Sequence, residues 1–256
     1  MLSWCAYCQQ FQGEIPPFEV FEISHGMCDV CARKDSFGGG AASLAHARAL
    51  QRIQTRLAHA GRRADRAGVE EIVDEAVAAG TRPIDILIGL TAPLLYKTGL
   101  AWEAATLTVA EEHRFTAFCE ETFAIVEMKV RDEQPGAFAH EGDPHPEIVV
   151  VNAPGNRHTF GIRVLVLWLL SRGRTARMIL SQTSVAKLVE EIVAAAPRLV
   201  AISVALPEQH AGAVTLVERL VARGLGAELI VGGNAVKQGM CPEIAGASLL
   251  ADITVL

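Results

Sequence analysis

The chain is predicted to be an α plus α/β protein, in which a helical bundle is followed by a Rossmann-like parallel β-sheet domain and preceded by a small zinc-binding-like module. Three observations predict this. Four cysteines crowd the first 31 residues, and apolar residues then recur at helical spacing as far as residue 130. From residue 148 onward, short β-branched runs alternate with helical stretches, which is typical of a parallel sheet covered on both faces.

Composition narrows the class of protein. The chain has 256 residues, half of them hydrophobic, and a formal net charge of −6. No apolar run approaches the roughly 20 residues that span a bilayer, and residues 1–12 lack the basic start and apolar centre of a signal peptide. We therefore expect a soluble cytoplasmic protein without a membrane partner, and the net charge gives no argument for nucleic acid.

Residues 1–35 are predicted to be an irregular, cysteine-rich zinc module. Cys5 and Cys8 form one C-x-x-C pair and Cys28 and Cys31 a second, with 19 residues between them. Four thiolates on two tight turns suit tetrahedral Zn²⁺, which also supplies folding energy to a short segment. The alternative is a redox-active disulfide pair, and His25 could replace one thiolate. The segment loosely resembles small cysteine motifs found beside bacterial signalling domains.

A linker helix is predicted over residues 41–67, after the flexible joint Ser36 to Gly40. One face is apolar. The other carries many arginines and a single acidic residue, Asp65: Arg48, Arg52, Arg56, Arg62, Arg63 and Arg66. Such a face contacts nucleic acid or an acidic partner in some proteins, but is more often simply solvated, and we prefer that interpretation.

Residues 69–133 are predicted to form the helical bundle. Gly80 ends one helix and Pro83 begins the next, and a further helical run extends from Val109 to Val130. Residues 134–146, rich in proline and glycine, are predicted to be an interdomain linker.

Residues 147–256 are predicted to form the sheet domain. The expected strands are Ile148–Val151, Met178–Leu180, Leu199–Val204, Leu229–Val231 and Ile253–Leu256; the expected helices are Gly161–Ser171, Val185–Ala195 and Ala213–Arg223. Ligands of such sheets lie outside the carboxyl ends of the strands. His158 follows the first strand, and a neutral imidazole is a good ligand for a transition metal. The alternative is a surface or helix-capping histidine.

The residues around His158 carry a longer pattern. Asn156-x-His158-x-x-Gly161 is followed after 41 residues by Ser203-x-Ala205, and after another 26 by Gly232-Gly233. This resembles the D-x-H-x-x-G, S-x-L, G-G pattern of the cobalamin-binding domains of methionine synthase, corrinoid proteins and B12-dependent photoreceptors, with all three spacings conserved in length. The resemblance implies that His158 is the lower axial ligand of cobalt, in place of the displaced benzimidazole.

The resemblance also assigns the other positions. Ser203 and the glycines would face the buried nucleotide tail, where backbone without a Cβ approaches closely; alone, Gly232-Gly233 would be an ordinary strand-to-helix turn. Two positions depart from the pattern. Asn156 replaces the usual acid, so it orients the imidazole without adding negative charge. Ala205 replaces leucine, which loosens packing around the tail.

A second resemblance lies in the helical segment. Trp102, nine residues, then Glu112-His113 match the W-x9-E-H pattern of adenosylcobalamin-binding bundles in CarH-type and AerR-type photoreceptors. It implies that Trp102 covers the upper ligand and that Glu112 and His113 hydrogen-bond it; the alternative is a core tryptophan and a solvated helix face. Glu103 stands where CarH-type proteins have a histidine that takes cobalt after illumination.

The function expected from these resemblances is non-enzymatic: a sensor in which light breaks the cobalt–carbon bond of adenosylcobalamin and changes contact with a regulatory protein partner of transcription or signalling. No helix-turn-helix precedes the bundle, so direct DNA binding is unsupported. Self-association into a homo-oligomer is left open. The alternative is a corrinoid carrier that presents methylcobalamin to a methyltransferase. A purely structural cobalamin or another tetrapyrrole is also left open.

Overall fold

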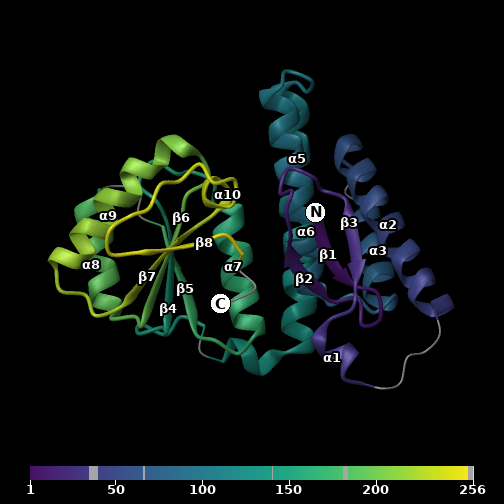
Figure 1. Ribbon diagram of the computed structural model, residues 1–256, viewed down its shortest axis with the longest axis horizontal. Coiled ribbons are helices and arrows are strands. Elements are labelled where there is room, and N and C mark those ends of the chain that lie inside the picture. The colour runs from purple at the N-terminus through teal and green to yellow at the C-terminus, as the bar shows by residue number, and fades with distance from the viewer. Residues whose placement is uncertain (35–39, 66, 140, 181–183, 253–255) are drawn as a thin grey trace. The chain divides into compact units, whose positions relative to one another are not determined.

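The computed structural model describes residues 1–34, 40–65, 67–139, 141–180, 184–252 and 256. The chain divides into two compact units, Met1–Glu133 and Gln134–Leu256, and each is described by itself (Figure 1). The prediction of a helical part followed by a parallel-sheet part is confirmed.

The first unit begins with a three-stranded sheet. Its strands are β1 (Leu2–Cys5), β2 (Phe11–Glu14) and β3 (Ile23–Gly26), in the order β2-β1-β3; β1 is antiparallel to β2 and parallel to β3. The short helix α1 (Asp29–Ala32) follows. The prediction that residues 1–35 are irregular was therefore wrong. Four-residue strands with polar and glycine positions carry little alternation, so their pairing across the chain is what creates them.

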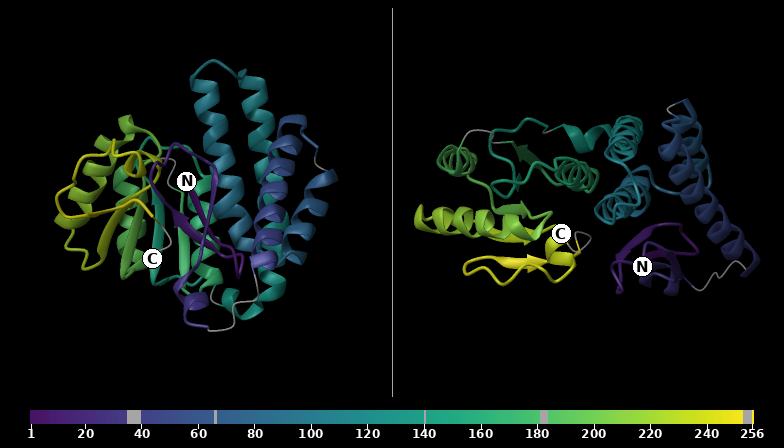
Figure 2. Two further views of the ribbon diagram at one scale, coloured as in Figure 1. Left: turned by 45° about the vertical axis from the view of Figure 1, so that its right-hand side comes forward. Right: turned by 90° about the horizontal axis from the view of Figure 1, so that it is seen from above.

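Helices make up the rest of this unit: α2 (Gly40–Arg63), α3 (Ala67–Ala78), α4 (Pro83–Ile86), the π-helical turn η1 (Leu87–Thr91), α5 (Ala92–Glu103) and α6 (Val109–Glu133). Figure 2 shows α5 and α6 side by side, joined at one tip. The predicted start at Pro83 is confirmed.

The helix α2 is a member of the bundle rather than a linker, which corrects the prediction for residues 41–67. It contacts α3 and α6, and Leu50, Ile53 and Leu57 are fully buried. Its arginine face is solvated as expected: Arg48, Arg52, Arg62 and Arg63 are exposed. Arg56 forms ion pairs with Glu71 and Glu75 of α3. Arg66 lies outside the described residues.

Pro83–Glu103 forms one continuous helical stretch through α4, η1 and α5. It is long and apolar enough to cross a membrane by composition, but 61% of its most apolar window is buried inside the protein. A mostly buried core helix passes the same test, so this is weak evidence for a membrane span.

The second unit is a five-stranded parallel sheet with helices on both faces. Its strands are β4 (Ile148–Asn152), β5 (Ala176–Ile179), β6 (Leu199–Ser203), β7 (Glu228–Gly232) and β8 (Ser248–Leu250). Its helices are η2 (Pro135–Phe138), α7 (Phe160–Ser171), α8 (Val185–Ala195), η3 (Pro207–Gln209), α9 (His210–Ala222) and α10 (Asn234–Lys237). Figure 1 shows the strands between α8 and α9 on one side and α7 on the other.

The strand order is β5-β4-β6-β7-β8, with every neighbouring pair parallel. Because connections leave β4 toward β5 and then return to β6, the order reverses between β4 and β6. Ligands of open parallel sheets bind outside the carboxyl ends of the strands at such a reversal. Four predicted strands and all three helices of this domain are confirmed. Of the predicted strand Ile253–Leu256, residues 253–255 lie outside the described residues, and the fifth described strand is β8 instead.

Candidate functional site

His158 lies in the loop between β4 and α7, at the carboxyl edge of the sheet. The side chain is exposed. Its Nδ1 lies 3.1 Å from Oδ1 of Asn156, and its backbone N–H donates to the same oxygen at 2.9 Å. Because an amide oxygen only accepts, this contact requires the proton on Nδ1, and in the neutral ring the lone pair then lies on Nε2. Nε2 makes no hydrogen bond to any residue that the structure describes, so the ring is oriented and this nitrogen has no protein partner there.

Asn156 ties this loop to the neighbouring strand. It is 8% exposed, and its Nδ2 donates to the carbonyl of Ser203 at 3.0 Å and to Oδ1 of Asn152 at 3.2 Å. Asn152 in turn donates to the carbonyl of His158 at 3.3 Å. An aspartate at position 156 would turn an oxygen toward two oxygen acceptors. The amide therefore suits this loop, which accounts for its departure from the acidic pattern.

The sequence pattern missed Asn152. Its position as the last residue of an apolar strand, at the carboxyl end, was the available indication.

The remaining predicted positions of this unit gather at the same edge. Ser203 pairs in the sheet with Asn152 and with Gly232, and Gly161 lies in the first turn of α7. The backbone N–H of Ala205 donates to Oε1 of Gln209, at 2.9 Å, and Gln209 is buried.

The protein itself explains the glycine at position 233. Gly233 has φ of +106°, and a Cβ there would lie 2.5 Å from the carbonyl oxygen of Val204. A Cβ on Gly232 would lie 3.0 Å from the carbonyl oxygen of Leu250. Close backbone packing at the end of β7 thus requires Gly233 with or without a ligand.

Trp102, Glu112 and His113 lie at the tip of the α5–α6 hairpin in the first unit. Trp102, in the last turn of α5, is 46% exposed, so the alternative that it is a core residue was wrong. Glu112 accepts a hydrogen bond from Oγ1 of Thr116 at 2.8 Å, and the strongly exposed His113 has Nε2 3.6 Å from Oε2 of Glu112. The Trp102 side chain is therefore accessible at the hairpin tip.

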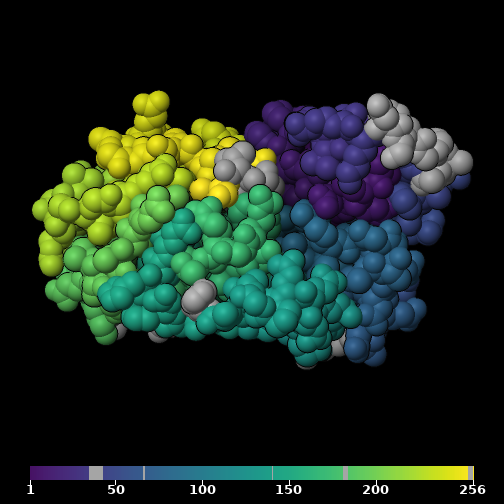
Figure 3. Space-filling model, turned by 90° about the horizontal axis from the view of Figure 1, so that it is seen from below, coloured from purple at the N-terminus to yellow at the C-terminus, as the bar shows by residue number. Residues whose placement is uncertain are grey.

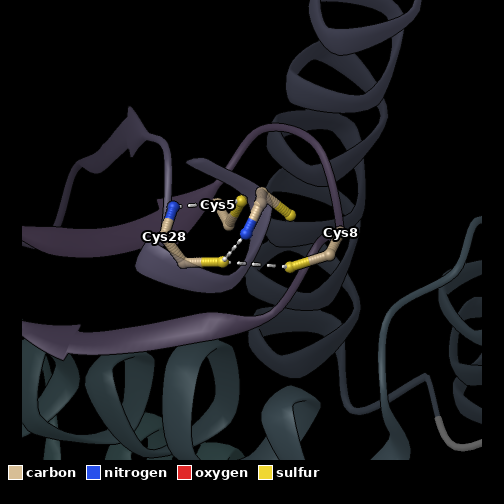
Figure 4. A group of neighbouring side chains, drawn as sticks. Cys5, Cys8 and Cys28 are labelled. Atoms are coloured by element: carbon tan, nitrogen blue, oxygen red, sulfur yellow. Dashed lines mark hydrogen bonds between the residues drawn. The ribbon is translucent and has the colours of Figure 1, made fainter. Parts of the chain in front are cut away.

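The four N-terminal cysteines form one cluster. Their Sγ atoms all lie within 4.8 Å of one another, and Figure 4 shows the sulfurs of Cys8 and Cys28 turned toward each other, 3.8 Å apart. Four ligands at about 2.3 Å from a tetrahedral Zn²⁺ would be separated by about 3.8 Å. The cluster fits a metal ion, and it forms without His25.

Backbone N–H groups donate to the sulfur atoms of this cluster and thereby stabilise negative charge on them. The N–H of Cys28 donates to Sγ of Cys5 at 3.5 Å, and that of Cys31 to Sγ of Cys28 at 3.4 Å. Burial opposes ionisation of Cys5, but N–H donors from Cys8, Cys28 and Tyr7 bring its pKa down to about 6. Burial raises the pKa of Cys8 to about 12. One thiolate forms readily, whereas all four need a cation to balance them.

Comparisons with known proteins agree with a corrinoid-type architecture. Residues 53–127 match the family model described as B12 binding domain, a stretch that includes Trp102, Glu112 and His113. The match supports cobalamin binding. No curated protein matches the chain.

Among solved structures, a monomethylamine corrinoid protein from Methanosarcina barkeri shares the fold, with a TM-score of 0.65 at 19% identity over 80% of this chain and 95% of that one. A methanol:cobalamin methyltransferase complex from Methanosarcina barkeri gives a TM-score of 0.39 at 14% identity, over 80% of this chain and 76% of that one. A cobalamin-binding protein from Desulfitobacterium hafniense DCB-2 gives 0.39 at 16%, over 78% and 93%.

Proposed function

We propose that this protein binds cobalamin without being an enzyme itself, and that Nε2 of His158 takes the lower axial position on cobalt. The observation that carries the proposal is the imidazole held by Asn156 at the strand-order reversal, with Nε2 free. The match of residues 53–127 to the B12 binding domain supports it. When bound, cobalamin supplies a cobalt–carbon bond that light or an acceptor nucleophile breaks.

Each residue group has a separate task in this proposal. Asn156 accepts the proton of Nδ1 in a hydrogen bond and fixes the ring plane, so that Nε2 would offer its lone pair to cobalt. Ser203, Ala205 and the glycines line the edge where the nucleotide tail would lie. Trp102, Glu112 and His113 would offer an aromatic face and polar groups to the upper ligand, preferably adenosyl. Cys5, Cys8, Cys28 and Cys31 hold Zn²⁺.

The finer proposal is light sensing. Loss of the upper ligand would remove a contact to Trp102 and change how the hairpin tip meets a regulatory protein partner. Its support is the W-x9-E-H pattern of Trp102, Glu112 and His113, together with the exposure of the Trp102 side chain.

The second candidate is a methylcobalamin carrier for a methyltransferase. The fold shared with a monomethylamine corrinoid protein favours it. In a carrier the upper face must open to a methyl acceptor, whereas a sensor shields it until light arrives.

One loading experiment separates the two. The protein is loaded in darkness with adenosylcobalamin or methylcobalamin, and absorption spectra and hydrodynamic size are recorded before and after illumination. We expect adenosylcobalamin to bind and illumination to change the size. Binding of methylcobalamin alone, with an unchanged size in the light, would favour the carrier. Failure to bind either would contradict the proposal as a whole.

A further inference from the structure

We infer that metal binding at the four cysteines regulates the helix that carries Trp102. The inference rests on the proposed function for its consequence, because Trp102 is assigned to the upper ligand there. The physical coupling itself rests only on contacts within the first unit. Figure 3 shows the N-terminal segment, in purple, packed against the blue helices of the same unit.

The N-terminal sheet is fitted onto the π-helical turn. Trp4 of β1 is fully buried, and Phe11 of β2 nearly so; their rings pack together with centroids 5.4 Å apart. Both rings press on Gly89, in the middle of η1. A Cβ at Gly89 would lie 2.4 Å from Cζ2 of Trp4 and 2.8 Å from Cδ2 of Phe11. The two rings therefore fit against the helix only because residue 89 has no side chain. We call this contact of Trp4 and Phe11 with Gly89 the seat.

A buried carboxylate next to the seat hydrogen-bonds β2 to the helix. Asp85 of α4 is completely buried. Its Oδ2 accepts from the backbone N–H of Phe11 at 3.1 Å, and both its oxygens accept from Arg82 at 2.8 Å. A paired, buried carboxylate is costly to disturb. Further along the helix, burial raises the pKa of Tyr96 to about 12, with the charge of Glu14 at the end of β2 adding to the effect. Strand β2 thus contacts the helical stretch at Asp85 and at η1.

The π-helical turn makes this stretch adjustable. Pro93 has no N–H to give the carbonyl of Gly89, and its ring crowds that carbonyl. The chain responds by widening: Ala92 donates to the carbonyl of Leu87, and Oγ1 of Thr91 donates to that of Ile86 at 2.9 Å. Such single-turn π-bulges are rare inside α-helices and are often found at functional sites. The residues that follow η1 are those of α5, which ends with Trp102 and Glu103.

The cysteine cluster is joined to the strands that carry Trp4 and Phe11. Cys5 is the neighbour of Trp4 in β1, and its N–H and carbonyl bond to Gln10 and Gln9, closing the turn that leads to Phe11. Cys28 donates its N–H to Sγ of Cys5. A sheet of three four-residue strands is stable only when its hydrophobic face is packed, here against the helix. Metal loss would free this turn, release the two rings from Gly89, and let η1 and α5 rearrange.

Hydrogen exchange on the full chain tests the coupling. Amide exchange is measured by mass spectrometry for metal-stripped protein and for the same protein reconstituted with Zn²⁺. We expect zinc to slow exchange at least ten-fold in residues 83–103, and to leave α8 and α9 of the second unit unchanged. Equal exchange of residues 83–103 in the two states, or failure to bind zinc, would overturn the inference.

A matched pair of variants locates the coupling at the seat. Gly89→Ala places a methyl group against Trp4 and Phe11, whereas Gly99→Ala, on the same helical stretch, meets nothing within 4 Å. We expect the zinc effect on residues 83–103 to disappear in Gly89→Ala and to persist in Gly99→Ala. A zinc effect that survives Gly89→Ala would mean that the seat does not transmit it, and the inference would fall.

Cobalamin affinity then tests the regulatory consequence. Adenosylcobalamin is titrated in darkness into the stripped and the zinc-loaded protein, and we expect at least five-fold weaker binding without zinc. Equal affinities would overturn the regulation. Absence of binding in both states would contradict the proposed function instead, and the exchange measurement would still decide the coupling.

Discussion

The His158 loop and the four-cysteine cluster both present metal-ligand side chains, but they are held in opposite ways. His158 lies on the edge of a five-stranded sheet whose central residues, including Val149 and Val200, are fully buried. Asn156, two residues away, orients it. The cysteines lie at the end of β1, in the turn after it and at the start of α1, and the buried rings of Trp4 and Phe11 pack on each other and on Gly89 of the helical bundle.

The difference shows that the His158 loop and the four-cysteine cluster draw their folding energy from different sources. The sheet is stable through its own apolar core, so the histidine is oriented before any ligand arrives. The cysteine module packs its buried rings on the bundle, and we expect the proposed metal ion to supply the rest of its folding energy. Loss of the ligand should therefore change stability little at the His158 loop and strongly at the four-cysteine cluster.

The largest effect is expected for Cys28→Ser. The change removes a thiolate that also accepts the N–H of Cys31. We expect the free energy of unfolding of the zinc-loaded protein to fall by about 3–5 kcal/mol, measured by denaturant titration. As a control, Cys241→Ser in the second unit should keep the difference in stability between zinc-loaded and stripped protein. Equal zinc stabilisation in both variants would mean that these cysteines hold no metal.

Asn156→Asp tests whether the His158 loop is fastened by the amide. The substitution loses the bond to the Ser203 carbonyl and sets a carboxylate oxygen near two acceptors, so we expect about 1–3 kcal/mol of destabilisation. Chemical denaturation followed by circular dichroism measures it. An unchanged stability would show that the loop tolerates an acid, and that the amide is not required by its neighbours.

A smaller effect is expected for Glu147→Gln, in the residue just before β4. Two hydrogen bonds from Arg174, each 2.8 Å, hold the pKa of Glu147 below its usual range. A carboxyl group whose pKa is lower in the folded state stabilises the folded protein at pH values above its unfolded-state pKa. This stabilisation is lost as the pH falls through the folded-state pKa. Because the pair is partly exposed, we expect the variant to be about 0.5–1 kcal/mol less stable at pH 7. The gap should close on acidification; a gap that is constant down to about pH 3 would contradict the assignment.

The smallest effect on stability is expected for Trp102→Ala, because this side chain is nearly half exposed. We expect a change within about 0.5 kcal/mol, together with adenosylcobalamin binding that is about 3- to 10-fold weaker. Thermal unfolding and a dark titration measure the two. A large loss of stability with unchanged affinity for adenosylcobalamin would show that Trp102 has a purely structural role.

The same contrast explains what could be predicted from the sequence. Strands β4, β6 and β7 differ from their predicted bounds by only one or two residues, because each is a β-branched run bounded by loop residues. The tie between Asn156 and His158 is local and follows from a short motif. The bond from Phe11 to Asp85 spans 74 positions, and the seat at Gly89 exists only once the sheet has docked. Neither leaves a periodic trace in the sequence.

The most direct test of the central claim is the absorption spectrum of bound cobalamin in His158→Ala, compared with wild type and with His145→Ala, whose Nδ1 lies 3.3 Å from the carbonyl oxygen of Ala195. We expect only His158→Ala to shift to the spectrum of water-ligated cobalt, with binding at least about ten-fold weaker. A His158→Ala spectrum and affinity identical to those of wild type would contradict the account.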